Sequence, residues 1–547
     1  MTIFFSLIIA MFVTMALIPP LMRSAERFQF IDAPNERKVH QGAIPRVGGI
    51  AMTLGTILPI LLWLSMLKPV IALLLGFAVI LFFGIWDDRK DLDYRLKFLG
   101  QFLAIFIVVI YGGVKISMVP FAGSEPVPDF ISIPLTIFFI LGITNAINLS
   151  DGLDGLAGGT TLIVLGIIAV MGYGAGDVVV VLVSLAIIGS ILGFLRYNTH
   201  PARIFMGDSG SQFLGFAVAV MAVMLTQNPE VPISAALPIL LLAIPIFDTF
   251  LVMGQRIYEG RSPFSADKNH IHHRLLEMGL DHYEAVASIY FMQSGVALMA
   301  YYMRYESDLA VISLFLVLGA VLLCGFCYAR SVNFRLRHIS DNNDSGRYLS
   351  NIQGVFSQDA KLKVRYFSLS LITGLVSIYF FFVALGVKEV AFDIGIICML
   401  FAVLLLVLNI NNFNKPLSWF ERAGSYLICT YIVYLEYSSG SVLNEVEGLG
   451  LALLTLLAIL IFLVLYCTSH KEFEITTHDL IVIFVAFVIP SLPGTVLSES
   501  NIGEVVTKLI ILFYAIELII TFVNKRTKLL RIVGMSLFCL LGLQSIL

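Results

Sequence analysis

Long apolar segments dominate the chain, and short polar stretches separate them. The apolar segments of the first 330 residues begin near positions 3, 48, 69, 98, 131, 160, 178, 211, 233, 285 and 308. A helix needs about 17–25 apolar residues to cross a bilayer, so this pattern predicts about eleven spans there. Further apolar segments after residue 366 predict about seven more. We therefore predict an all-α, polytopic integral membrane protein.

The pattern changes once along the chain, at a polar stretch rich in arginine and lysine between residues 331 and 365. We predict a membrane domain over residues 1–330, a cytoplasmic polar linker over 331–365 and a multi-span C-terminal extension over 366–547. The extension has no dense polar motif and no visible repeat of the first half, so the pattern assigns it no role.

The composition agrees with a membrane protein. Hydrophobic residues make up 59% of the 547 residues, and the mean hydropathy is +0.93. Soluble globular domains are nearer to half apolar, which excludes that class. A net charge of −3 gives no basic character that would favour nucleic acid. All six cysteines follow residue 320, so no thiol lies near the polar motifs of the first half.

Lysine and arginine predict which loops share a side of the membrane. Eleven alternating spans place the loops 22–47, 87–97, 149–159, 196–210 and 254–284 on one side. These loops carry fifteen Lys and Arg residues, whereas the opposite loops carry only Lys68, Lys115 and Arg304. Basic loops stay in the cytoplasm, so we expect the five loops to be cytoplasmic and the N-terminus to lie outside. The motifs in these loops can then meet at one membrane face.

Two of these loops place carboxylates at the end of an apolar segment. Asp87 and Asp88 end an apolar segment, and Lys97 begins the next one. Adjacent carboxylates repel each other unless a divalent cation or a cationic partner neutralises them. Asp208 enters a later span between small residues, where it could instead be a plain helix cap.

The third loop is the most specific: it reads Asn-Ala-Ile-Asn-Leu-Ser-Asp-Gly-Leu-Asp from position 145 to 154. Asn145 and Asn148 share a helix face, and an amide oxygen suits a hard cation. Asp151 and Asp154 follow, among glycines that permit close approach of a ligand. Polar groups at the end of a membrane helix are costly unless they bind something.

The last loop contains His270, His272, His273 and Arg274. The surrounding carboxylates and amides favour Mg²⁺ over zinc, so we interpret these side chains as donors to a diphosphate or sugar. Asp248 lies inside the ninth apolar segment and is either functional or paired with a neighbouring helix.

The first loop offers cations for a phosphate group: Arg37, Lys38, His40 and Arg46. Gly48 and Gly49 follow at the start of a helix, where backbone can approach a ligand closely. A basic cytoplasmic loop is expected in any case, so this motif is weak on its own.

Together these motifs resemble the polyprenyl-phosphate N-acetylhexosamine-1-phosphate transferase family. The resemblance covers residues 1–330 and rests on the motifs Asp87-Asp88-x-x-Asp91, Asn145 to Ala157, Phe205-Met-Gly-Asp208-x-Gly-Ser211 and His270-Ile-His-His273, with Arg37-Lys38-x-His40 and Ile44-Pro-Arg46-x-Gly-Gly49. The His-Ile-His-His form is similar to the undecaprenyl-phosphate GlcNAc-1-phosphate branch that starts O-antigen, enterobacterial common antigen or teichoic-acid chains.

The resemblance implies a Mg²⁺-dependent transfer, with Mn²⁺ as an alternative ion, from a UDP-N-acetylhexosamine to undecaprenyl phosphate, with release of UMP. It implies an active site on the cytoplasmic face of the bacterial inner membrane, and it leaves a homodimer open. Asp87 and Asp88 would be catalytic, Asn148 and Asp208 would hold the metal, Asp154 would contact uracil and Lys97 the diphosphate. His270, His272, His273 and Arg274 would face diphosphate and sugar, and we expect further substrate-binding residues at Lys38, Arg46, Asp91, Asn145 and Asp151.

Two mechanisms stay open. Asp87 or Asp88 could deprotonate the lipid phosphate, or one of them could attack first and form a covalent intermediate. We favour direct attack, because a lipid phosphate is already an anionic nucleophile. The competing function is a transporter or flippase for a lipid-linked sugar, which predicts charges near the middle of the bilayer and symmetry between the halves.

Overall fold

The computed structural model describes the helices of the first 331 residues and parts of the C-terminal region. The described ranges are residues 2–32, 43–121, 125–227, 232–262, 269–331, 358–386, 449–467 and 502–522, together with a few isolated positions between 399 and 543. Lys38, with Arg37 and His40, lies outside them, so the predictions for these three residues stay untested.

The architecture is helical, which confirms the predicted fold class. The first unit contains α1 (Thr2–Phe28), α2 (Gly48–Trp63), α3 (Lys68–Lys90), α4 (Tyr94–Phe106), α5 (Asp129–Ser150), α6 (Leu156–Gly174), α7 (Val178–Asn198), α8 (Gly207–Thr226), α9 (Leu237–Leu241), α10 (Ala243–Tyr258), α11 (Ile271–Glu277), α12 (His282–Tyr302) and α13 (Asp308–Ser331). A π-helical turn, Ile107–Tyr111, extends α4, and a 3₁₀ turn, Met303–Tyr305, follows α12. Strands β1 (Ile31–Asp32) and β2 (Ile44–Pro45) form a short antiparallel pair.

Eight helices of this unit are long and apolar enough to cross a membrane, among the residues that the structure describes. The remaining three predicted spans take other forms. Helix α2 is shorter, the span expected near residue 233 is divided into α9 and α10 at Leu242, and α12 is not among the eight although it has 21 residues. The chain is thus a multi-pass membrane protein, and the count of eleven spans stays a prediction.

The local sequence sets where these helices begin and end. Pro69 occupies the first turn of α3, where a missing N–H costs nothing, and Asp91 ends α3 in a left-handed conformation at φ 45°. Asp177 caps α7 by accepting from the N–H of Val180. Asp281 and Glu284 form a reciprocal capping box at the start of α12.

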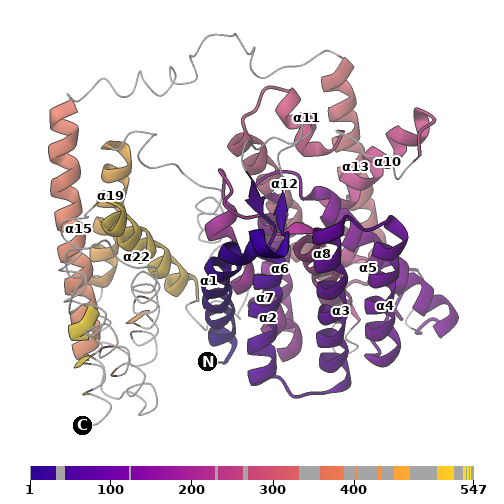
Figure 1. Cartoon of the computed structure of the whole chain (residues 1–547), viewed down its shortest axis with the longest axis horizontal. Helices are drawn as coiled ribbons and strands as arrows, with labels where there is room; N and C mark the ends of the chain where they lie inside the picture. The colour runs from indigo at the N-terminus through magenta and orange to yellow at the C-terminus, as the bar shows by residue number, and fades with distance from the viewer. Residues whose placement is uncertain are drawn as a thin grey trace. The chain divides into compact units, whose positions relative to one another are not determined.

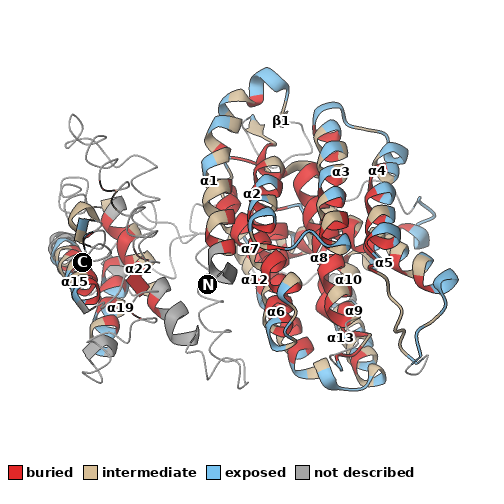
Figure 2. Ribbon diagram, turned by 90° about the horizontal axis from the view of Figure 1, so that it is seen from below, coloured by how far each residue is buried: buried red, intermediate tan, exposed pale blue. Residues whose placement is uncertain are grey.

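Helix α8 is the centre of the first unit. It is buried almost throughout and packs against α2, α3, α5 and α6, while α13 is mostly exposed. Figure 2 shows this gradient, with buried residues concentrated on the inner helices and exposed residues on the outer faces of α3 and α4. Outer faces rich in leucine and phenylalanine suit contact with lipid.

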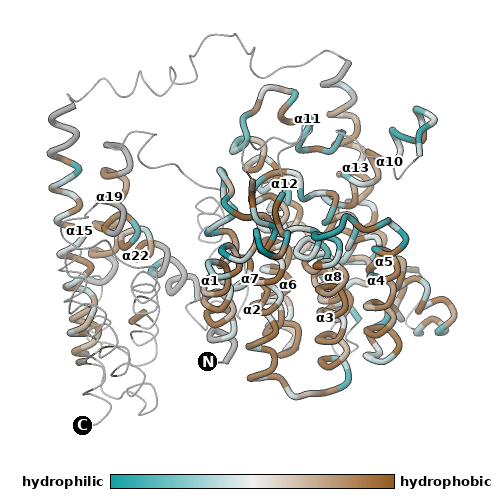
Figure 3. The backbone as a smooth tube through the Cα atoms, in the orientation of Figure 1, coloured by the Kyte–Doolittle hydropathy of each residue, from teal (hydrophilic) through white to brown (hydrophobic). Residues whose placement is uncertain are grey.

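The polar ends of several helices gather at one end of this unit. The tube in Figure 3 is brown along most helices and teal near the upper ends of several of them and beside α11. In Figure 1 the start of α1 lies at the opposite end of the unit from α11. The helix bundle therefore brings polar loops from distant parts of the sequence to one end.

The second unit comprises residues 341–475 and 482–547. Its described helices α15 (Gln358–Gly386), α19 (Leu449–Cys467) and α22 (Ile502–Phe522) pack around an apolar core. Helix α15 begins inside the segment predicted as a linker over 331–365. Buried in this unit, the Tyr379 hydroxyl donates to Glu436, and Lys508 Nζ lies 3.0 Å from the other oxygen of Glu436. These paired groups hold three parts of the unit together.

Candidate active site

The N-terminus of α8 is held by the end of α3. Both carboxylate oxygens of Asp88 accept backbone N–H groups, from Asp208 at 2.7 Å and from Ser209 at 3.1 Å. Gly207 adopts φ +69°, and a Cβ there would lie 2.4 Å from Asp88 Oδ1, so glycine is required by conformation and by space. Asp88 therefore fixes the start of α8 and, with it, the position of Asp208, and its predicted catalytic role stays a prediction.

Asp87 points to a different set of partners. Lys97 Nζ lies 2.6 Å from Asp87 Oδ2 and 3.4 Å from Asp208 Oδ2, so one ammonium bridges two carboxylates. Asp87 Oδ1 also accepts from the N–H of Leu92 at 2.8 Å. Three helices, α3, α4 and α8, thus bring Asp87, Lys97 and Asp208 together as the sequence predicted.

Asn148 completes this group from the end of α5. Its amide nitrogen donates to Asp208 Oδ1 and to Ser211 Oγ, both at 2.7 Å. The amide and the carboxylate predicted to bind a metal are therefore adjacent, and a rotation of the amide by 180° would turn its oxygen toward Asp208. Carboxylate and amide oxygens are the ligands that Mg²⁺ prefers, and the bridging ammonium shows that the group accommodates a cation. The donor set fits Mg²⁺.

Asn145, one turn earlier, belongs to a buried amide network. Its amide nitrogen donates to Gln101 Oε1 at 2.8 Å, and Gln101 in turn donates to Gln212 Oε1 at 3.0 Å. These bonds join α4, α5 and α8 one helical turn before Asn148. The structure therefore gives Asn145 a role in packing, and its predicted contact with substrate stays a prediction.

Asp151 ends α5, three residues before Asp154. The residue is exposed to solvent, although many protein atoms lie around its carboxylate. This desolvation, followed by the negative charges of Asp208, Asp154 and Asp88, raises the pKa of Asp151 to about 7. A cation bound nearby would favour its ionised form.

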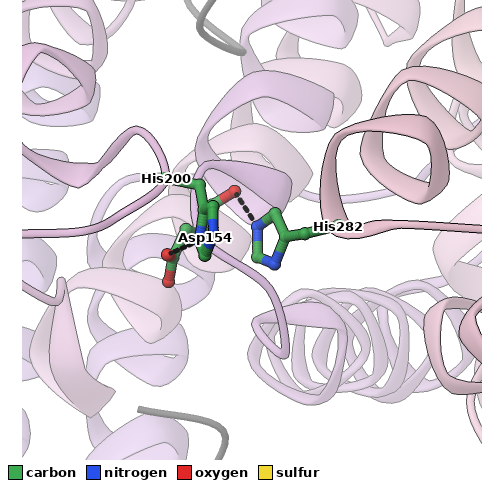
Figure 4. A group of neighbouring side chains, drawn as sticks. All are labelled: Asp154, His200 and His282. Carbon is green, nitrogen blue, oxygen red and sulfur yellow. Dashed lines mark hydrogen bonds and ion pairs between the residues drawn. The ribbon is translucent and has the colours of Figure 1, made fainter. Parts of the chain in front are cut away.

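Asp154 is tied to two histidines that the sequence analysis did not single out (Figure 4). Its Oδ2 accepts from His200 Nδ1 at 2.7 Å and from the N–H of Ala202 at 3.1 Å, and its backbone oxygen lies 3.4 Å from His282 Nε2. The rings of His200 and His282 stack with centroids 4.0 Å apart and 19° between planes. Burial and the charge of His200 lower the pKa of His282.

These three side chains are close enough to share a metal ion. However, the two rings are nearly parallel, so the lone pairs of their nitrogens lie in parallel planes and do not point to one shared position. Asp154 also already bonds to His200 directly. The arrangement is satisfied as a hydrogen-bonded cluster that fixes Asp154, the residue predicted to contact uracil. The sequence carried no signal for this cluster, because the three residues lie far apart along the chain.

In the histidine segment, too, a carboxylate pairs with a histidine. His270 Nδ1 lies 2.8 Å from Asp248 Oδ2, and both residues are buried. His272 is also buried, and its Nε2 has no hydrogen-bond partner. A Cβ on Gly152 would lie 2.1 Å from that nitrogen, so His272 packs against the loop of Asp151 and Asp154. His273 and Arg274 are partly exposed.

For Asp248 the sequence left two interpretations open, because its depth in an apolar segment is compatible with a functional residue or with a partner on a neighbouring helix. The structure shows that its partner is the histidine segment itself.

Burial, followed by the charge of His273, lowers the pKa of His272 to about 3, so that ring is neutral near pH 7.

The remaining predicted residues that the structure describes have partners outside the group of Asp87, Lys97, Asn148 and Asp208. Arg46 pairs with Asp32 and lies 3.9 Å from Asp91, and Arg274 donates to Gln255 Oε1 and to the backbone oxygen of Asn269, both at 2.8 Å. Gly48 and Gly49 donate their N–H groups to the oxygens of Phe205 and Met206. The close approach expected for these glycines is thus made to the segment that begins α8.

Comparison with known proteins gives consistent matches. Residues 70–226 match the family model described as glycosyl transferase family 4. The chain is 40% identical over 289 residues to the probable undecaprenyl-phosphate N-acetylglucosaminyl 1-phosphate transferase of Bacillus subtilis, covering 52% of this chain and 80% of that protein.

Two further relatives have matching names. A decaprenyl-phosphate N-acetylglucosaminephosphotransferase of Mycobacterium leprae is 37% identical over 306 residues, covering 50% of this chain and 76% of that protein. The undecaprenyl-phosphate alpha-N-acetylglucosaminyl 1-phosphate transferase of Escherichia coli K12 is 30% identical over 317 residues, covering 56% of this chain and 86% of that protein.

Proposed function

The chain belongs to the polyprenyl-phosphate N-acetylhexosamine-1-phosphate transferases, within glycosyl transferase family 4, and we propose that its donor is UDP-N-acetylglucosamine and its acceptor undecaprenyl phosphate. The products are UMP and a lipid-linked diphospho-sugar, which begins a cell-surface polysaccharide. The observation that carries this proposal is the meeting of Asp87, Lys97, Asn148 and Asp208 at one end of the bundle.

Both substrates are anionic, so neutralising charge is the main task of the site. Asn148 and Asp208 would hold Mg²⁺, which would bind the diphosphate and offset the charge that develops on departing UMP. Lys97 would add a second positive charge near the same oxygens. A fixed array of charges needs no rearrangement during the reaction, which is why preorganisation by α3, α5 and α8 favours transfer.

The lipid phosphate would enter from the bilayer, and its oxygen would attack the phosphorus that carries the sugar. A new phosphorus–oxygen bond forms, and the bond to the UMP phosphate breaks. Asp87 would accept the remaining proton of the lipid phosphate or orient that phosphate through Lys97. Direct attack is favoured over a covalent intermediate because the lipid phosphate is already a competent anion.

Asp154 would select the nucleotide by accepting the imide N–H of uracil. Its Oδ2 is already engaged by His200 and Ala202, so Oδ1 is the oxygen assigned to the base. The site would face the cytoplasm at the bacterial inner membrane, with the N-terminus outside, in agreement with the distribution of basic residues in the loops.

The test is a panel of UDP-sugars offered to the purified protein with undecaprenyl phosphate and Mg²⁺, with release of UMP as the readout. UDP-N-acetylglucosamine should give the fastest release, and UDP-glucose, which lacks the acetamido group, should give little. Failure of every UDP-N-acetylhexosamine to yield UMP would refute the proposal. Faster release from another N-acetylhexosamine would correct only the identity of the sugar.

A further inference from the structure

Asp248 is a buried carboxylate with both of its oxygens engaged by the histidine segment. Oδ2 lies 2.8 Å from His270 Nδ1, and Oδ1 accepts the N–H of Ile271 at 2.7 Å. The residue is only 4% exposed and His270 only 5%, so water competes little for these bonds. Burial of a carboxylate is costly, and these two bonds are what offset the cost.

The partner atom determines the state of the histidine. An ionised carboxylate only accepts hydrogen bonds, so His270 Nδ1 must carry a proton. In the neutral ring, Nε2 is then the acceptor, and in the charged ring it is a donor. The bond also fixes the direction in which the ring lies, as seen for histidines whose second nitrogen binds a carboxylate.

The orientation of His270 influences the other histidines of its segment, because their rings are in contact. The His270 ring is parallel to that of His272 within 8°, at 5.7 Å between centroids, and His272 lies 4.2 Å from the ring of His273. His272 in turn packs against Gly152, next to Asp151. Asp248 therefore lies at one end of a row that connects α10 to the acidic loop.

We propose that Asp248 is a positioning residue for the transfer reaction, which acts by holding His270 in one orientation and protonation pattern against the substrate site. This inference rests on the proposed function. Asp248 itself contacts no reacting atom. Asp248 affects turnover only through His270, so an experiment can distinguish this effect from a purely structural role.

The test uses the full-length protein and the variant Asp248→Asn. The asparagine keeps the size and one acceptor oxygen for Ile271, but its NH₂ group faces His270 Nδ1 and reverses the direction of that bond. We expect kcat to fall about 10- to 100-fold, as when a carboxylate behind a functional histidine is removed, with less than about 3-fold change in KM for UDP-N-acetylglucosamine.

A double-mutant cycle with His270→Ala separates positioning from stability. Once the imidazole is gone, Asp248→Asn should reduce kcat by less than about 2-fold further, because interacting residues are not additive. The matched control is Thr249→Val, whose hydroxyl donates only within α10, to the oxygen of Pro245 at 2.9 Å. This variant should keep wild-type kcat.

Two results would overturn the inference: wild-type kcat in Asp248→Asn, or a loss in the double variant equal to the product of the two single losses. The second result would mean that Asp248 stabilises the fold without acting through His270. If the wild-type protein itself released no UMP, the proposed function would fail instead, and the two failures are thereby distinguished.

Discussion

At the scale of single residues, Asp87 and Asp88 have different partners although they are adjacent in sequence. Asp88 holds the backbone at the start of α8, whereas Asp87 faces Lys97 and Asp208. The sequence predicted the pair as catalytic, but it could not divide their roles, because the division depends on where α8 begins. The two carboxylates should respond differently to the same substitution.

We predict that Asp87→Asn keeps the melting temperature of the wild type and lowers kcat by about 10²- to 10⁴-fold, since it removes a charge that faces the reacting groups. Asp88→Asn keeps one acceptor oxygen but places its NH₂ group against one of the two backbone N–H donors, so it should cost about 1–3 kcal/mol of stability. Thermal unfolding in detergent, measured beside UMP release, checks both variants. An equal melting temperature for the two would contradict this division.

His272 predicts a dependence of stability on pH. Burial lowers its pKa to about 3, below the value near 6.5 expected in the unfolded chain, so the unfolded state gains the proton more readily. The contribution of His272 to the free energy of unfolding is constant above about pH 6.5, and it is lost as the pH falls toward 3. At pH 5 this amounts to about 2 kcal/mol.

The variant His272→Gln cannot gain that proton. Its melting temperature should therefore fall less between pH 7 and pH 5 than that of the wild type. The pH slope is the readout, since the absolute stability of the variant also reflects changed packing. Identical slopes for the two proteins would show that His272 does not remain neutral in the fold.

At the scale of helices, glycines set how closely α2 and α3 approach the start of α8. A Cβ on Gly84 would lie 2.4 Å from Ser209 Cα, and a Cβ on Gly49 would lie 2.3 Å from the backbone nitrogen of Gly210. The apolar pattern predicted these helices and their order. It could not predict the approach, because glycine in an apolar segment is equally compatible with open space.

Gly166 in α6 provides the comparison, since a Cβ there would meet nothing within 4 Å. We predict that Gly84→Ala destabilises the protein by about 1–3 kcal/mol and lowers turnover by displacing Asp208. Gly166→Ala should be neutral or stabilising by up to about 1 kcal/mol, because alanine favours a helix. Thermal unfolding of both variants checks this, and equal melting temperatures would refute the packing argument.

The sequence predicted the acidic group better than its surroundings. Asp87, Lys97, Asn148 and Asp208 could be grouped because carboxylates and amides at ends of apolar segments are unusual, and loop charge placed them on one side. His200 and His282 carried no such signal, since single histidines in polar loops are common. Their contact with Asp154 depends on tertiary packing that no local pattern encodes.

At the scale of the whole molecule, the chain has a transferase part and a second unit. The similarity to the relatives covers 76–86% of their own lengths but only 50–56% of this chain. The second unit has its own apolar core and a buried Glu436–Lys508 pair. This organisation is typical of an added domain.

We predict that a protein truncated after Ser331 folds and releases UMP with kcat within about 3-fold of the full chain, because domains with separate cores fold independently. Circular dichroism and size-exclusion chromatography in detergent would establish folding, and the UMP assay would measure activity. A truncated protein that is folded but inactive would assign the second unit to the catalytic machinery.

The most direct test of the central claim is UMP release by the purified full-length protein from UDP-N-acetylglucosamine, compared with and without undecaprenyl phosphate and Mg²⁺. The proposal predicts that release requires both, stops with EDTA, recovers with added Mg²⁺, and falls at least about 100-fold in Asp208→Asn. Release that persists in EDTA, or that Asp208→Asn leaves unchanged, would contradict a metal-assisted transfer at this site.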